Sequence, residues 1–224
     1  MSALNGDLSR FVVMRTAEMP WSASPSDRVW RKRLHHVGPE ESGQVTSVVR
    51  FEPGATFASH DHPDGEEILV LDGVFSDEQG DFGKGSYLLN PEGFRHAPFS
   101  REGCILFVKL RQYPGRNRPA RHLDTADIAW EAQGPGVRSQ ALFNDEGFPD
   151  STWLEEWQGG HVREFAAEGG LEIFLIEGTA ESREGLFGPG DWLRFPAGSA
   201  VEISARTAVR AYVKRGFCDL LTSA

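Results

Sequence analysis

The segment His60-Asp61-His62-Pro63-Asp64-Gly65-Glu66-Glu67 carries most of the information about this chain's fold and chemistry. Side chains alternate across a β-strand, so the rings of His60 and His62 point to the same face and are placed to bind one ion. Proline followed by Asp64 and Gly65 is typical of a tight turn. Glu66 comes directly after that turn, where an apolar strand begins. We therefore predict two adjacent strands that carry three metal-binding groups.

A second Gly/Pro turn, within Gly85–His96, leads to a further histidine. Together the two regions fit the patterns G-x5-H-x-H-x3-E-x6-G and G-x5-P-x-G-x2-H at Gly54, His60, His62, Glu66, Gly73, Gly85, Pro91, Gly93 and His96. These patterns resemble the two motifs of the cupin family, small β-barrels that hold a divalent metal with three histidines and one glutamate. The asparagine that often ends the second motif is replaced by Ser100. The resemblance implies that the metal ligands are His60, His62, Glu66 and His96.

Short apolar segments separated by Gly, Pro, Asp or Ser turns dominate the whole chain. They include residues 11–14, 45–51, 66–72, 86–90 and 105–110, and no long helical period interrupts them. This pattern predicts an all-β protein of many short strands.

The chain contains an internal repeat. A shift of 105 residues, the separation of Gly54 and Gly159, needs no gap and superposes turn glycines, one proline (Pro91 on Pro196) and apolar positions of the two halves. We therefore predict two tandem barrels of the double-stranded β-helix or jelly-roll type, a bicupin. We place the metal-binding barrel at residues 1–113, a linker rich in Pro, Gly and charge at 114–120, and a degenerate barrel at 121–224.

The repeat separates the scaffold from the chemistry. The same shift replaces the four candidate ligands together by apolar residues, namely Phe165, Ala167, Leu171 and Val201. Glu67, in contrast, has a counterpart in Glu172, where no metal can bind. Strand parity also turns Glu67 away from the face of Glu66. We therefore expect Glu66 to be the ligand and Glu67 to have a structural role.

Composition excludes several classes of protein. With 39% hydrophobic residues and a net charge of −10, the chain is typical of a globular protein and poorly suited to bind nucleic acid. No apolar run approaches the length of a membrane span and the N-terminus has no signal pattern, so we expect a cytoplasmic protein with no membrane partner. Two cysteines without a Cys-x-x-Cys motif exclude a zinc knuckle.

The neighbouring histidines His35 and His36 receive a different interpretation. Adjacent residues on a strand point to opposite faces, so both cannot line one site. We expect them at the surface.

The donor set defines what the ion can do. Three neutral imidazoles and one carboxylate leave a divalent ion with one net positive charge and one or two open positions at coordination five or six. We expect one divalent metal per chain, zinc first, with Fe(II), Mn(II) or Ni(II) as the alternatives. Access through one barrel mouth favours a small molecule as ligand.

The resemblance is closest to one group of cupins. Residues 62–77, together with Asn90-Pro91 and 96–100, resemble the cupin domain of ChrR-type anti-sigma factors, and the likeness extends from Trp21 to Gln112. In that family the cupin domain binds zinc and is needed for the response to singlet oxygen or organic peroxides. A separate N-terminal helical zinc domain binds the sigma factor. The sequence has no His-x3-Cys-x2-Cys pattern for such a domain, so we do not expect sigma-factor sequestration by that mode.

Two functions follow from the resemblance. The first is a ChrR-like sensor or regulatory module that answers oxidants or a small ligand through its metal. The alternative is a non-haem metal-dependent dioxygenase of the cupin type, acting on a small dicarbonyl-like substrate. The sequence assigns no catalytic acid or base, so it does not decide whether the protein is an enzyme. A homodimer is compatible with either function.

Overall fold

The computed structural model describes residues 3–113 and 117–221, and its regular elements are strands apart from two short 3-10 turns. The all-β prediction is confirmed. The chain forms two compact units, the first from residues 3–6 and 19–128 and the second from 7–18 and 129–221. Each unit is described by itself. No helix of the described residues is long and apolar enough to cross a membrane.

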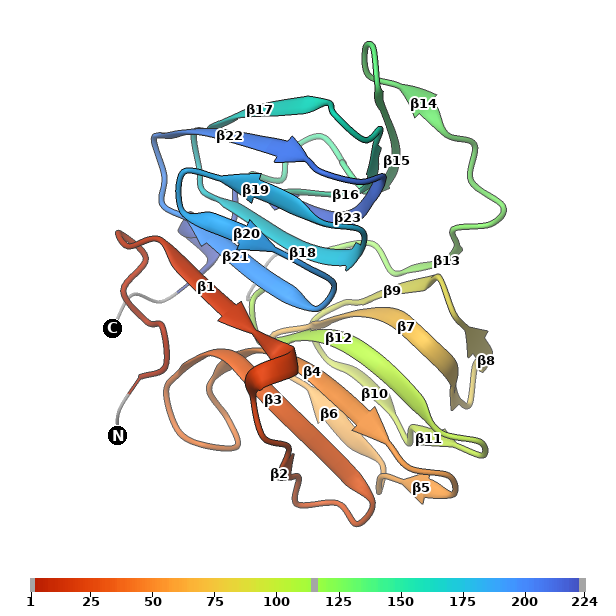
Figure 1. Ribbon diagram of the computed structural model, residues 1–224. Helices are drawn as coiled ribbons and strands as arrows, with labels where there is room; N and C mark the ends of the chain where they lie inside the picture. The colour runs from red at the N-terminus through yellow and green to blue at the C-terminus, as the bar shows by residue number, and fades with distance from the viewer. Residues whose placement is uncertain (1–2, 114–116, 222–224) are drawn as a thin grey trace. The chain divides into compact units, whose positions relative to one another are not determined.

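The first unit is built on one large antiparallel sheet with the strand order β13-β9-β7-β12-β4-β3-β2. Shorter pairs complete it, formed by β6 with β10, β5 with β11 and β8 with β7 (Figure 1). The strands are β2 (Ser22–Ala23), β3 (Val29–Val37), β4 (Gln44–Phe51), β5 (Ala55–Thr56), β6 (His60–His62), β7 (Glu66–Asp77), β8 (Gly80–Gly83), β9 (Ser86–Asn90), β10 (Phe94–His96), β11 (Phe99–Ser100), β12 (Cys104–Leu110) and β13 (Arg121–Asp124).

The core of the first unit lies on the inner face of this sheet. Ile68 on β7 and Leu106 and Val108 on β12 are at most 6% exposed, because inward positions recur every second residue along each strand. Ser47 on β4 lies in the same row as Val108 and Ile68. Ser47 thus stands between the apolar residues of β12 and β7 on one side and Arg33, its partner on β3, on the other.

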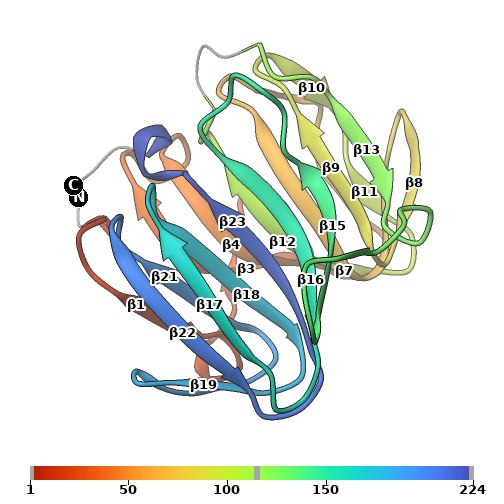
Figure 2. The same ribbon diagram turned by 90° about the horizontal axis from the view of Figure 1, so that it is seen from above.

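The second unit has a large sheet and a small sheet. The large sheet has the order β1-β21-β18-β23-β16-β15-β14, and the small one has the order β17-β22-β19-β20 (Figure 2). The elements are β1 (Val12–Arg15), η1 (Thr16–Glu18), β14 (Glu131–Ala132), β15 (Val137–Phe143), β16 (Ser151–Trp157), β17 (Val162–Ala167), β18 (Leu171–Glu177), β19 (Ala180–Ser182), β20 (Gly185–Phe187), β21 (Asp191–Phe195), β22 (Ser199–Ala205), β23 (Val209–Arg215) and η2 (Cys218–Leu220).

The two units use the same pairing at corresponding positions. In the first unit His60 pairs with His96, and in the second Phe165 pairs with Val201, which are the residues that the repeat aligns with them. Phe165 and Val201 belong to the hydrophobic core of the second unit, together with Ala167 and Leu171. The side chains that replace the histidines and the glutamate therefore fill the interior of the second unit.

The unit boundaries differ from the predicted division at two strands. β1 pairs with β21 and belongs to the second unit, whereas β13 pairs with β9 and belongs to the first. The predicted division places β1 in the first barrel and β13 in the second. The physical reason is that β9 and β21 each present an open edge, and a strand from the other half of the sequence supplies its hydrogen bonds. Residues 114–116 of the predicted linker lie outside the described residues.

The expectation for His35 and His36 is wrong, since the two side chains are 0% and 8% exposed. A register shift between Arg33 and His35 bends β3 at this point. His35 Nδ1 lies 3.0 Å from the carbonyl oxygen of Asn5, because residues 4 and 5 run beside the strand. The N-terminal segment thus covers this end of β3.

Candidate metal centre

Two turns bring the four predicted ligands together. β6 and β10 pair so that His60 lies opposite His96 and His62 opposite Phe94. The backbone N–H groups of Gly65 and Gly93 both donate to the carbonyl oxygen of His62, at 3.2 and 2.8 Å. Gly65 has a φ of +76°, which favours glycine, and the turn then delivers Glu66 at the start of β7. Local turn chemistry thus places side chains from three strands at one point.

The structure places the donor atoms of these residues within coordination reach of one another. Ligand atoms of His60, His62 and His96 all lie within 4.8 Å of one another. The Nε2 atoms of His62 and His96 are 3.0 Å apart. Glu66 Oε2 lies 3.5 Å from the first of these atoms and 3.6 Å from the second. The three histidines could therefore hold a metal ion, with the glutamate carboxylate beside them.

The distances and the ring orientations fit a divalent ion. Two imidazole nitrogens bound to one ion at about 2.0–2.1 Å stand roughly 3 Å apart, as the Nε2 atoms of His62 and His96 do. His60 Nδ1 lies 2.9 Å from the carbonyl oxygen of Ala58, and His96 Nδ1 lies 3.0 Å from Asp77 Oδ2. A carbonyl and a carboxylate can only accept, so each neutral ring donates Nδ1–H and presents the Nε2 lone pair to the centre.

The electrostatic environment differs between the two buried histidines. Burial lowers the pKa of His62. The negative charge of Glu66 raises this pKa, and the neighbouring imidazoles lower it, so the net shift is downward. Burial acts in the same direction on His96, but the hydrogen bond to Asp77 and the charges of Glu66 and Asp77 raise its pKa above the usual value. Burial raises the pKa of Asp77, but the hydrogen bonds from His96 and the Gln79 backbone, with the charges of His96 and His122, together lower it below the usual value. Asp77 is thus an ionised, fully buried partner of His96.

Glu66 and Glu67 have separate partners, as strand parity predicts. Glu66 faces the histidines and accepts a hydrogen bond of 2.9 Å from Asn90 Nδ2. Glu67 accepts hydrogen bonds from the hydroxyl groups of Tyr87 and Tyr113, both of which are buried. The side chain of Glu67 is therefore committed to a polar cluster away from the candidate site.

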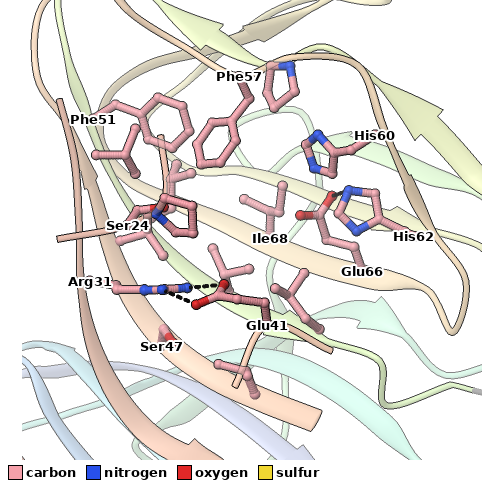
Figure 3. Close-up of a pocket in the computed structure, with 18 of the residues that line it drawn as sticks. Ser24, Arg31, Glu41, Ser47, Phe51, Phe57, His60, His62, Glu66 and Ile68 are labelled. Carbon is pink, nitrogen blue, oxygen red and sulfur yellow. Dashed lines mark hydrogen bonds and ion pairs between the residues drawn. The ribbon is translucent and has the colours of Figure 1, made fainter. Parts of the chain in front are cut away.

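A cavity of about 210 Å³ lies inside the first unit and reaches the candidate ligands. Figure 3 shows the rings of His60 and His62 and the carboxylate of Glu66 on one side of this cavity, with Phe51 and Phe57 also lining it. The rest of the wall is mainly aliphatic and comes from β3, β4, β7 and β12, with Val29, Val45, Val49, Ile68, Leu106, Val108 and Leu110 among its residues. A molecule in this cavity would have apolar surroundings and direct access to the ligand atoms.

The polar lining of the cavity contains one strong ion pair. Arg31 donates from both terminal nitrogens to Glu41, at 2.7 and 3.1 Å, and Figure 3 shows this pair at the cavity wall. The hydrogen bonds from Arg31 lower the pKa of Glu41, and the charges of Arg31, Arg33 and Arg111 lower it further. Arg111 also lines the cavity. The positive charge of Arg111 also lowers the pKa of His62.

Sequence reasoning missed the two residues that hold the candidate ligands in place, Asp77 and Asn90. Neither belongs to the motif spacing. A signal was nevertheless present, because the repeat aligns them with Ser182 and Phe195, so the carboxylate and the amide are both lost where the ligands are lost. No feature of the sequence indicated that residues of β3 and β4 line a cavity beside the candidate ligands.

The chain is similar in structure to several solved proteins. A candidate dioxygenase from Nostoc punctiforme is 16% identical, with a TM-score of 0.75 over 99% of this chain and 93% of that one. The protein YlbA from E. coli is 13% identical, with a TM-score of 0.71 over 93% and 92%. A mutant of Bacillus subtilis oxalate decarboxylase is 13% identical, with a TM-score of 0.61 over 95% and 79%. At these identities the likeness shows the fold alone.

The sequence itself matches one family model twice. No curated protein matches the chain. The model of the ChrR cupin-like domain matches residues 9–114 and again residues 119–217, one match for each half of the predicted repeat. The tandem repeat and the predicted cupin fold are therefore confirmed, and the chain belongs to the ChrR cupin-like domain family.

Proposed function

We propose that the first barrel is a metal-dependent sensor of a small molecule or an oxidant, with one divalent ion bound by His60, His62, Glu66 and His96. The observation that carries this proposal is the cavity of about 210 Å³ whose wall includes three of those four residues. An ion held there would have protein ligands on one side and a chamber large enough for a ligand on the other. Zinc is the metal we expect, with Fe(II), Mn(II) and Ni(II) as alternatives.

The second barrel supports this proposal by contrast. It keeps the pairing of the first barrel but fills the corresponding positions with Phe165, Ala167, Leu171 and Val201. A metal needed only to stabilise a cupin barrel would be expected in both copies. A metal kept in one copy, beside a cavity, suits a functional site.

The cysteines do not offer another route for an oxidant response. Burial raises the pKa of the Cys104 thiol to about 11. Burial also raises the pKa of Cys218. Because the thiolate is the form that oxidants attack, both thiols are poor sensors. The metal centre is therefore a better candidate than either thiol for an oxidant response.

The first experiment measures metal content and the response to oxidants in the same samples. Protein purified without added metal or chelator is analysed by inductively coupled plasma mass spectrometry, beside a His60→Ala, His62→Ala double variant. We expect about one zinc ion per chain in the natural protein and less than a tenth of that in the variant. Treatment with hydrogen peroxide, tert-butyl hydroperoxide or a singlet-oxygen source should then release the zinc or change the tryptophan fluorescence.

A matched control removes a histidine elsewhere. His161 lies outside the candidate site, before β17 in the second unit, so His161→Ala should keep the natural metal content. The sensor proposal fails if oxidants and small ligands leave both metal occupancy and conformation unchanged. The metal proposal fails if neither the natural protein nor the variant contains a stoichiometric metal.

A non-haem dioxygenase is the second candidate function. It is favoured by the direct contact between the cavity and the ligand residues, because a substrate and O2 could both approach the open side of an Fe(II) ion. The test is oxygen uptake by the iron-loaded protein with a panel of 1,3-dicarbonyl compounds. Uptake that depends on both His60 and the substrate would establish catalysis. No uptake with iron bound at one ion per chain would count against it.

A further inference from the structure

Two buried polar atoms of residues that line the cavity have no hydrogen-bond partner among the described residues, Arg31 Nε and Ser47 Oγ, and only the second belongs to an uncharged side chain. Ser47 is 2% exposed, lines the cavity, and its Oγ makes no hydrogen bond within the part of the chain that the structure describes. It lies on β4 between Val108 of β12, on an apolar side of the wall, and Arg33 of β3, on a charged side. A buried hydroxyl without a partner is costly unless a bound molecule supplies the hydrogen bond. Ser47 therefore indicates a polar group on the ligand.

The charge of the lining indicates a second feature. Arg31 is neutralised by Glu41, Arg33 by Glu40 and Glu41, and Asp61 by Arg95. Arg111 also lines the cavity, and none of the described carboxylates lies within 4.0 Å of its guanidinium.

The backbone of Arg111 is also fixed in position. It has a φ of +57°, which is uncommon for a residue other than glycine, and its N–H donates to the carbonyl oxygen of Gly65, the residue before Glu66. The backbone of Arg111 is therefore held beside Glu66, and its guanidinium, whose charge also acts on Glu41, remains available to a ligand in the cavity. With three neutral imidazoles and one carboxylate, a divalent ion would add a further net positive charge. The cavity therefore favours an anionic ligand.

The size of the cavity limits that ligand. An apolar cavity of about 150 Å³ accepts benzene, so one of about 210 Å³ accepts a six-membered ring with a few substituents. We propose that the cavity of the first barrel binds a small organic carboxylate of this size, with its carboxylate beside Arg111 and the metal and a hydroxyl or carbonyl group on Ser47. This inference rests on the proposed metal-dependent function and names the ligand class for it.

The test is isothermal titration calorimetry of the metal-loaded natural protein with defined probes. The probes are benzoate, its three monohydroxy isomers and benzyl alcohol. Benzoate should bind at least tenfold more tightly than benzyl alcohol, because the alcohol lacks the charge that pairs with Arg111. At least one hydroxybenzoate should bind about five- to tenfold more tightly than benzoate, because its hydroxyl completes the hydrogen bond of Ser47.

Three variants assign these effects to residues. Ser47→Ala should remove the preference for the hydroxybenzoate and keep benzoate affinity, since it deletes a hydroxyl that has no partner in the folded protein. Ser139→Ala is the matched control, because Ser139 is equally buried with an unpartnered Oγ but lies in the second unit. Arg111→Gln should weaken every carboxylate about tenfold and leave benzyl alcohol unchanged.

The outcomes distinguish this inference from the proposed function. Protein that carries one metal per chain but binds no carboxylate better than benzyl alcohol overturns the inference and leaves the metal site standing. A hydroxybenzoate preference that is absent, or that survives in Ser47→Ala, overturns the role of Ser47. Protein without stoichiometric metal overturns the proposed function, and the inference with it.

Discussion

Asp77 provides the sharpest prediction about how the protein supports the proposed metal ion. Its carboxylate is fully buried and accepts a hydrogen bond from His96 Nδ1 at 3.0 Å. We predict that removing this group weakens metal binding without removing any ligand. A carboxylate partner fixes the orientation of a ligating imidazole and raises its basicity, and loss of such a partner typically costs 10- to 100-fold in metal affinity.

The structure ranks two substitutions within that range. Asp77→Asn keeps the shape and an oxygen that can accept from His96, so it removes mainly the charge. We expect about a tenfold weaker Kd for zinc, which corresponds to about 1.4 kcal/mol. Asp77→Ala also removes the acceptor and leaves a buried donor unsatisfied. For Asp77→Ala we expect the Kd for zinc to be weaker by nearly a hundredfold, which corresponds to about 2.7 kcal/mol.

The assay is competition for zinc with a chromophoric chelator at fixed pH and salt. Asp77 also accepts from the backbone N–H of Gln79, so circular dichroism must first show that each variant is folded. Asp81→Asn is the control, because Asp81 lies four residues further on, is exposed, and bonds to Ser76 and Arg101 instead. Folded Asp77→Asn and Asp77→Ala proteins that both bind zinc with the natural Kd would refute the reasoning.

Three further predictions concern the scaffold. Cys104, whose pKa is raised to about 11, should be about 0.1% thiolate at pH 8 and should react with a thiol reagent only after denaturation; rapid labelling of Cys104 in the folded protein, distinguished from Cys218 by peptide mass mapping, would contradict this. Gly73→Ala should lower the free energy of unfolding by about 2–4 kcal/mol, because φ is +72° and a Cβ would collide with the carbonyl oxygen of Gly103. Gly93→Ala, with φ +80° and open space around it, should cost only about 1–2 kcal/mol, and equal urea midpoints would count against the steric argument. Glu155→Gln should destabilise the second unit by about 2 kcal/mol, since two arginines share its buried carboxylate, and unchanged stability or altered metal content would be the contrary result.

The part of the candidate site that depends on local spacing could be predicted from the sequence. His60 and His62 are two residues apart on one strand, and a tight turn separates them from Glu66, so simple strand geometry groups them. His96 came from a second motif, and the internal repeat then separated ligand positions from scaffold positions. The structure brings these four side chains together, and the role of metal ligand remains a prediction.

The parts that depend on long-range contacts could not be predicted in this way. Strands β1 and β13 belong to the unit opposite to the one expected, because each completes the sheet edge of the other half. His35 is buried because the N-terminal segment runs beside β3, a contact that strand parity does not reveal. Asp77 sits at the far end of β7 from Glu66, so only the fold brings it to His96.

The most direct test of the central claim is an anomalous difference map from crystals of the protein purified without added metal. Data collected on either side of the absorption edge of the metal found in solution would locate that metal. We predict one peak per chain in the first barrel, within coordination distance of His60, His62, Glu66 and His96, and none at the corresponding positions of the second barrel. A stoichiometric metal bound elsewhere, or no peak among these four side chains, would contradict the account.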